Sequence, residues 1–185
     1  MIITVLTSLF DEMQKAGMSS TLLFRAGLSA TDISRLEEEY GIVLHPDIRE
    51  CYLFRDGLVN DLYSMNCWYY KYFRWLPLRE AMEAYEDFNE NLYEVLEIDQ
   101  TFFPILEGTC DYIAVLNDPQ LKPEVFSYDP ASGITKRYLD LETMFATHLR
   151  CWQQGIFTIA DGLMTVSSRE TEVSRAMNPR CDFWG

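Results

Sequence analysis

The chain has little histidine and none of the common catalytic or nucleotide-binding motifs. Only two of its 185 residues are histidine, and no HExxH pair is present. A P-loop, a glycine-rich dinucleotide turn and a G-x-S-x-G nucleophile turn are also missing. These absences remove the usual signatures of metal-dependent, nucleotide-dependent and serine-type enzymes. We therefore expect no catalytic residue, no metal site and no cofactor, and we predict that the protein is not an enzyme.

The two histidines favour structural roles. His45 precedes Pro46 at an expected helix start, where its side chain would cap the helix. His148 lies beside Phe145 on the apolar face of a later helix, which is typical of a histidine at the edge of a core. Cys151 follows three residues later and could contact His148, but no third group orients the pair. A catalytic Cys–His pair is therefore disfavoured.

Cysteines are few, odd in number and widely spaced. The five, with no CxxC among them, are Cys51, Cys67, Cys110, Cys151 and Cys181. This pattern is neither a disulfide framework nor a zinc site. We expect small buried apolar side chains in a reducing compartment.

Long apolar runs are absent as well. No uncharged apolar stretch approaches 18 residues, so the sequence predicts no membrane span. The first ten residues are apolar but lack a basic region and a small-residue cleavage site before Asp11. The expected location is the cytoplasm.

Basic residues are scarce, and this shapes the expected partners. Lys and Arg total 15 against 29 Asp and Glu, which gives a net charge of −14. Such a charge repels nucleic acids and anionic membranes and attracts basic surfaces over about 8 Å. We expect a basic protein partner, no nucleic acid and no membrane.

What is present favours one well-packed domain, because 48% of the residues are apolar. Periodicity predicts helices at 2–16, 30–40, 46–55, 78–97, 141–154 and 168–177, and strands at 68–76, 102–106, 111–116, 124–128 and 134–138. Helix N-caps are expected at Ser29 and Asp140, and helix ends at Gly41 and Gly155. Strands grouped in sequence favour an α+β fold with a mostly antiparallel sheet flanked by helices.

One of these strands carries an aromatic run, residues 68–75, with Lys71 and Arg74 among the rings. Aromatic rings with interleaved cations can stack nucleobases. In a chain of this charge, a strand that buries one aromatic face is the favoured interpretation.

The helix at 78–97 carries the main functional signal. Residues 80–100 include eight acidic residues and no basic one. Ala81, Tyr85, Phe88, Leu92, Val95 and Leu96 fall on one side of this helix. The opposite side presents a continuous acidic stripe, formed by Glu80, Glu83, Asp87, Glu90, Glu94 and Glu97.

Two interpretations of the acidic stripe stay open. Each like-charge pair three or four residues apart costs about 0.2–0.5 kcal/mol, and no Lys or Arg relieves the repulsion. The stripe is either a solvated helix face or a surface that docks a basic partner, and we predict the second as the binding site.

Several segments resemble the SUKH superfamily of fungal Smi/Knr regulators and bacterial immunity proteins. These are a helix ending at Gly41, His45-Pro46 and a second helix, then Asp56-Gly57, and later residues 75–78, 103–105 and 110–113. His45 and Asp56 replace the Leu and Asn usual in that family. The resemblance implies a single SUKH-like domain at 28–155, after an N-terminal helix and linker (1–27) and before a C-terminal extension packed on it (156–185).

The resemblance also implies a function. Bacterial members mostly bind and neutralise a cognate toxin, often a nuclease, whereas fungal members act as regulatory scaffolds. We expect a cytoplasmic immunity protein that binds a toxin domain through its acidic surface. A regulatory protein-binding module of the same fold is the alternative, and an enzyme of unrecognised type is a third.

Overall fold

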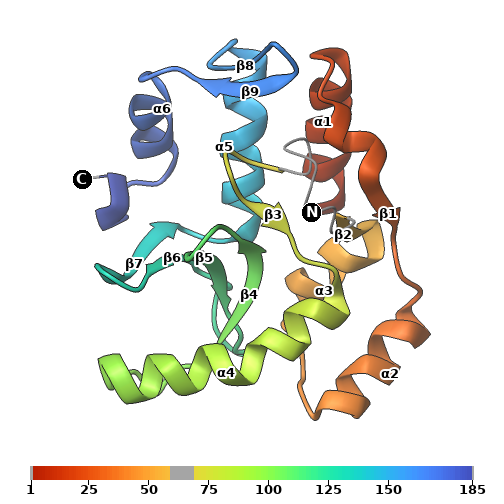
Figure 1. Cartoon of the computed structure of the whole chain (residues 1–185), viewed down its shortest axis with the longest axis vertical. Coiled ribbons are helices and arrows are strands. Elements are labelled where there is room, and N and C mark those ends of the chain that lie inside the picture. The colour runs from red at the N-terminus through yellow and green to blue at the C-terminus, as the bar shows by residue number, and fades with distance from the viewer. Residues whose placement is uncertain (1, 59–68, 185) are drawn as a thin grey trace.

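A computed structural model describes residues 2–58 and 69–184, with the side chains of Val95 and Leu96 excepted. Helices are concentrated in the first half of the chain, and four strands then follow one another from β4 to β7 (Figure 1). Their order is α1 (Ile2–Lys15), 3₁₀ helix η1 (Ser19–Leu23), β1 (Phe24–Ala26), α2 (Ala30–Tyr40), α3 (Pro46–Phe54), β2 (Arg55–Leu58), β3 (Arg74–Trp75), α4 (Leu78–Leu96), β4 (Phe102–Glu107), β5 (Tyr112–Leu116), β6 (Val125–Asp129), β7 (Gly133–Tyr138), α5 (Leu141–Gln153), β8 (Phe157–Ala160), β9 (Leu163–Val166), α6 (Glu170–Met177) and η2 (Asp182–Trp184).

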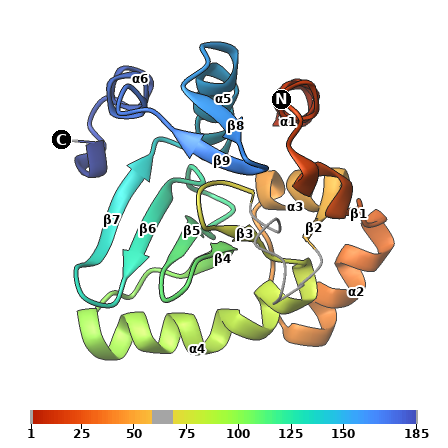
Figure 2. The ribbon, with the colours of Figure 1, turned by 45° about the horizontal axis from the view of Figure 1, so that its top comes forward.

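The central feature is a five-stranded antiparallel sheet in the order β3-β4-β5-β6-β7. Helix α4 crosses one face, and α5 and α1 lie on the other side of the sheet (Figures 1 and 2). Phe88 and Leu92 of α4 pack on Phe102 and Ala114, while Val115 points into the larger core on the other side. The predicted α+β fold with a mostly antiparallel sheet is confirmed.

Local capping determines where several helices begin and end. Ser29 Oγ accepts a hydrogen bond from Asp32 N at 3.1 Å, and Asp140 accepts one from Thr143 N at 2.7 Å. His45 Nδ1 accepts from Asp47 N, and its Nε2 lies 3.2 Å from Leu121 O. The expected caps at Ser29, His45 and Asp140 are confirmed, as are the ends at Gly41 and Gly155.

The aromatic run is not the strand that its composition predicts. A single antiparallel bridge joins Tyr70 to Phe73, Lys71 has a φ of 51°, and only β3 continues as strand. Trp68, the first residue of the predicted strand, lies outside the described residues. The error has a physical reason: the tight turn lets the neighbouring Tyr69 and Tyr70 both enter the core, which a regular strand would not allow, and no Gly, Pro or Asn marks that turn in the sequence.

The cysteine prediction holds in part. Cys51, Cys151 and Cys181 are free and buried, but Cys110 is free and exposed, which contradicts the prediction for that residue. Cys67 lies outside the described residues. The short pairs β1–β2 and β8–β9 were not predicted, because each strand has only three or four residues.

Both ends of the described chain pack on the central domain. Leu6, Leu9 and Met13 of α1 join the main core. At the other end, Trp184 Nε1 donates to Arg137 O at 2.5 Å, and Asn178 Oδ1 accepts from Leu139 N at 3.2 Å. The division at residues 27 and 155 remains a prediction.

A carboxylate distant in sequence caps α4. No side chain at Pro77 caps the helix, and Asp56 of β2 accepts a hydrogen bond from Leu78 N at 2.9 Å. Arg25 lies 3.8 Å from the same carboxylate. Burial is the main cause that raises the pKa of Asp56 above its usual value. For the stability of α4, a hydrogen-bond acceptor at position 56 therefore matters more than a negative charge there.

We expect Asp56→Ala to lower the free energy of unfolding by about 1–2 kcal/mol, because the first turn of α4 loses its cap. Asp56→Asn keeps a carbonyl acceptor and should stay within about 0.5 kcal/mol of the parent protein. Urea unfolding followed by circular dichroism measures both. Equal stability of the alanine and asparagine variants would contradict the capping role.

Candidate functional site

Helix α4 is fixed to the sheet along one side. Ala81, Phe88 and Leu92 are buried beneath it. Asn89 Nδ2 donates to Phe102 O at 2.9 Å, and its Oδ1 accepts from Phe102 N at 2.7 Å. Packing and the two hydrogen bonds of Asn89 to β4 therefore fix the orientation of α4, so its outer side faces in one direction.

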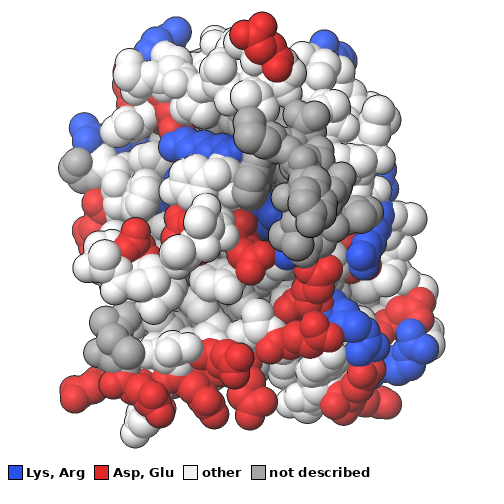
Figure 3. Space-filling view, viewed as in Figure 1, with Lys and Arg blue, Asp and Glu red and all other residues white. Residues whose placement is uncertain are grey.

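That outer side carries the predicted acidic stripe. The carboxylates gather along the lower edge of the molecule in Figure 3, where α4 runs in Figure 1. Among the described residues, no Lys, Arg or His lies within 4.0 Å of the exposed members, which are Glu83, Asp87, Glu90, Glu94 and Glu97. From Glu83 to Glu94 the stripe is exposed and helical, and most of its charge is uncompensated. The prediction that Glu97 lies on the helix is wrong, because α4 ends at Leu96 and Glu97 has a left-handed backbone with a φ of 55°. Val95 and Leu96, expected on the buried side, lie outside the described side chains.

The N-terminal end of the stripe differs from the rest. Glu80 is half-buried, and its carboxylate pairs with Arg74 Nη1 at 2.7 Å. Arg74 Nη2 pairs with Glu107 at the same distance, so one guanidinium bridges α4 and β4. Glu83 accepts a hydrogen bond from Tyr40 Oη at 3.2 Å. The unpaired charge is therefore concentrated from Asp87 onward.

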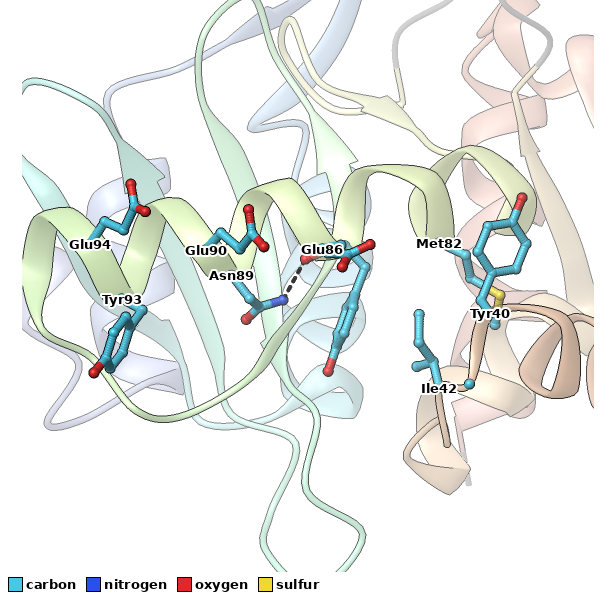
Figure 4. Close-up of a pocket in the computed structure, with 10 residues that line it drawn as sticks. Tyr40, Ile42, Met82, Glu86, Asn89, Glu90, Tyr93 and Glu94 are labelled. Atoms are coloured by element: carbon cyan, nitrogen blue, oxygen red, sulfur yellow. Dashed lines mark hydrogen bonds between the residues drawn. The ribbon is translucent and has the colours of Figure 1, made fainter.

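A groove of about 640 Å³ runs beside the stripe, between α4 and the end of α2 (Figure 4). Glu86, Glu90 and Glu94 stand along α4 at intervals of four residues, and Tyr93 lies at the groove's far end from Tyr40. The other lining residues are Gly41, Ile42, Met82, Tyr85 and Asn89. The groove combines carboxylates with aromatic rings.

This lining suits cationic side chains. Carboxylates pair with guanidinium or ammonium groups, and tyrosine faces attract the same cations. The chain gives one example at the groove's rim, where Arg79 lies 5.7 Å from the Tyr40 ring and pairs with Glu39 at 2.6 Å. A lysine or arginine of another protein would meet the same combination further along α4.

Sequence reasoning missed part of this site. Glu86 lies four residues before Glu90, so the spacing that defined the stripe could have found it. Tyr40 and Ile42 join the site only because α2 ends against α4, and no local pattern indicates that contact. Tyr93 is 62% exposed, which marks it as a candidate contact residue.

The structure does not assemble the Cys–His pair considered from the sequence. His148 is fully buried, with Nδ1 3.0 Å from Tyr69 Oη and Nε2 3.1 Å from Tyr138 Oη. Burial lowers the pKa of His148 well below its usual value. Burial also raises the pKa of Cys151 to about 12, so its thiol stays protonated.

The described part of the chain was expected to hold neither a metal site nor a membrane span. No group of three or more His, Cys, Asp or Glu side chains there is arranged to hold a metal ion. No helix among residues 2–58 and 69–184 is both long and apolar enough to cross a membrane.

Fold and surface together define a small α+β domain with one rigid, acidic helical face. The chain belongs to the SMI1 / KNR4 family (SUKH-1), whose family model matches residues 27–147. This family includes immunity proteins and Smi1/Knr4-type regulators, which are generally non-catalytic and bind partner proteins. No protein of curated function matches the chain significantly.

Proposed function

We propose that this protein is a cytoplasmic immunity protein that binds and neutralises a toxin domain with a basic surface. The observation that carries the proposal is the uncompensated charge on a fixed helix, from Asp87 to Glu94. The repulsion within the stripe opposes folding, whereas a basic partner would relieve it. A surface of this kind is therefore better explained by binding than by stability.

A nuclease toxin is the partner that this surface fits best. A nuclease presents basic residues to phosphates, so an acidic protein can cover the same residues. Complementary charge also speeds encounter between the two proteins, and the groove beside α4 offers tyrosine rings to inserted arginines. The protein would act by occupying the toxin's surface, without chemistry of its own.

The test uses three charge reversals on exposed side chains, Asp87→Lys, Glu90→Lys and Glu94→Lys, in one variant. We expect affinity for the toxin domain encoded beside this protein to fall at least 100-fold at low salt, because close interfacial charge pairs contribute several kcal/mol together. Calorimetric titration measures the affinity, and co-expression with the toxin measures rescue of growth. Folding stability should not fall, since the reversals relieve repulsion within α4.

A matched control distinguishes a loss of affinity caused by the α4 face from one caused by the change in net charge. Asp11→Lys, Glu38→Lys and Glu172→Lys make the same change in charge at exposed positions outside α4. This control should retain nearly all binding. Equal losses in the two variants would reject α4 as the docking face, and normal rescue by the α4 variant would reject the proposed mechanism.

The second candidate function is that of a regulatory scaffold, because the family also includes regulators. The neighbouring genes distinguish an immunity protein from a regulator. A gene upstream for a large secreted protein with a variable C-terminal domain supports immunity, whereas its absence supports regulation.

A further inference from the structure

A second pocket lies on the opposite face of the sheet from α4. Its volume is about 190 Å³, enough for about six waters at about 30 Å³ each. Phe126 and Tyr128 pack toward α4, so the alternate residue Ser127 of β6 points to this other face. The pocket is lined by Lys71, Tyr72, Asp111, Ser127, Asp129, Ser132, Gly133, Thr135, Arg137 and Phe183. The groove beside α4 shares none of these residues.

One wall holds a buried arginine without a carboxylate partner. Arg137 is only 3% exposed, and among the described residues no carboxylate lies within 4.0 Å of it. Its Nη2 donates to Tyr70 Oη at 3.1 Å, its Nη1 reaches Ser127 Oγ only at 3.5 Å, and its Nε has no acceptor. Buried charges in proteins are normally paired, so this guanidinium lacks part of its expected environment.

The neighbours of Arg137 do not supply the missing acceptor. The Phe183 ring lies 4.1 Å from the guanidinium carbon, and this face-on contact stabilises the charge without accepting its in-plane N–H groups. Glu170 already accepts a hydrogen bond from Tyr70 and pairs with Lys71 at 2.9 Å. A ligand with a hydrogen-bond acceptor could enter the pocket and satisfy the unpaired N–H groups of the Arg137 guanidinium.

Charge is separated along the pocket. Ser127 pairs with Thr135 in the β6–β7 hairpin. Arg137 follows Thr135 by two residues, so the cation lies toward the end of β7 that is away from the hairpin turn. Asp129 pairs with Gly133 at the hairpin's end. Asp111 precedes Tyr112, which pairs with Tyr128 beside Asp129, so both acids lie at that same end. One end of the pocket is cationic and the other is anionic.

We infer that this pocket binds a small amino carboxylate, with the carboxylate toward Arg137 and the ammonium toward Asp111 and Asp129. A guanidinium recognises a carboxylate through paired N–H donors, and carboxylates recognise an ammonium group. An anion alone would meet the two aspartates unfavourably, and a cation alone would meet Arg137. This binding is independent of the toxin-docking function.

The probes for the test are glycine, β-alanine and 4-aminobutyrate, which place the two charges at increasing separation. Acetate and methylammonium, at matched ionic strength, carry one charge each. We expect at least one amino carboxylate to shift the amide signals of the pocket in ¹H–¹⁵N spectra saturably, with a Kd at least tenfold below those of both single-charge probes. If no amino carboxylate binds more tightly than acetate and methylammonium, the inference is wrong.

Isosteric variants locate the site. Asp111→Asn with Asp129→Asn keeps acceptors for Tyr72 Oη and for Ala131 N while it removes both charges. We expect this variant to bind the preferred amino carboxylate at least tenfold more weakly. Asp118→Asn is the matched control, since Asp118 also accepts from the backbone N–H two residues on but lies outside the pocket. Arg137→Gln should abolish binding, and unchanged affinity in the folded double variant would overturn the inference.

Discussion

Replacement of Gly57 with alanine is expected to lower the free energy of unfolding by more than about 3 kcal/mol, through backbone strain and overpacking together. Gly57 has a φ of +68°, in the left-handed region that side chains disfavour. A Cβ at this position would lie 2.4 Å from Pro77 N and 2.5 Å from Leu76 C, and backbone atoms cannot move aside as a flexible side chain can. Gly57 is required because β2 passes directly over the start of α4.

Gly41 provides the matched control for this prediction. Its φ of +66° is nearly the same, but a Cβ there would meet nothing within 4 Å. Gly41→Ala should therefore cost only the left-handed strain, about 1 kcal/mol. Urea unfolding of both variants, followed by circular dichroism, separates strain from crowding. Equal losses at the two glycines would show that the close approach to Pro77 is unimportant.

Mild acid is expected to destabilise the protein through His148. Burial, then the charges of Arg137 and Lys71, hold the pKa of His148 well below 6.5 in the folded state. The unfolded chain binds a proton near pH 6.5, so stability present above that pH is lost as pH falls below it. The slope is about 1.4 kcal/mol for each pH unit until the folded pKa is reached.

His148→Gln isolates this contribution. Glutamine can donate to one of the flanking hydroxyls, Tyr69 Oη or Tyr138 Oη, and accept from the other, but it does not titrate. The free energy of unfolding, measured in urea at pH 7.5, 6.5 and 5.5, should fall more steeply for the parent protein than for this variant. Asp56, whose raised pKa acts in the opposite sense, is common to both proteins. Parallel pH profiles would show that His148 is not the group responsible.

Patterns with a local physical cause predicted the fold well. Capping at Ser29 and Asp140 and the left-handed end at Gly41 depend on neighbouring residues, so the sequence indicates them directly. The turn at Tyr70–Phe73 was missed because contacts from far along the chain hold it, including the stack of Tyr70 on His148 at 4.4 Å. Nothing near Tyr70 in the sequence records that contact.

The same distinction applies to the sites. Helical spacing alone predicted the exposed stripe, but it could not indicate that Arg74 pairs with Glu80, since Arg74 lies on a separate strand. Asp56 as the cap of α4 and Arg137 as a buried cation were also beyond prediction. Each depends on residues brought together by the fold, at sequence separations of 22 for Asp56–Leu78 and 67 for Arg137–Tyr70.

The C-terminal contacts of β7 have a consequence for solubility. β7 is the last strand of the sheet, and unpaired backbone groups on such a strand can recruit strands from other molecules. Here Trp184 Nε1 donates a hydrogen bond to Arg137 O near the end of β7, and Asn178 Oδ1 accepts one from Leu139 N just beyond it. The strand at the opposite edge of the sheet, β3, is only two residues long. We therefore expect the C-terminal segment to hinder strand addition at this end of β7.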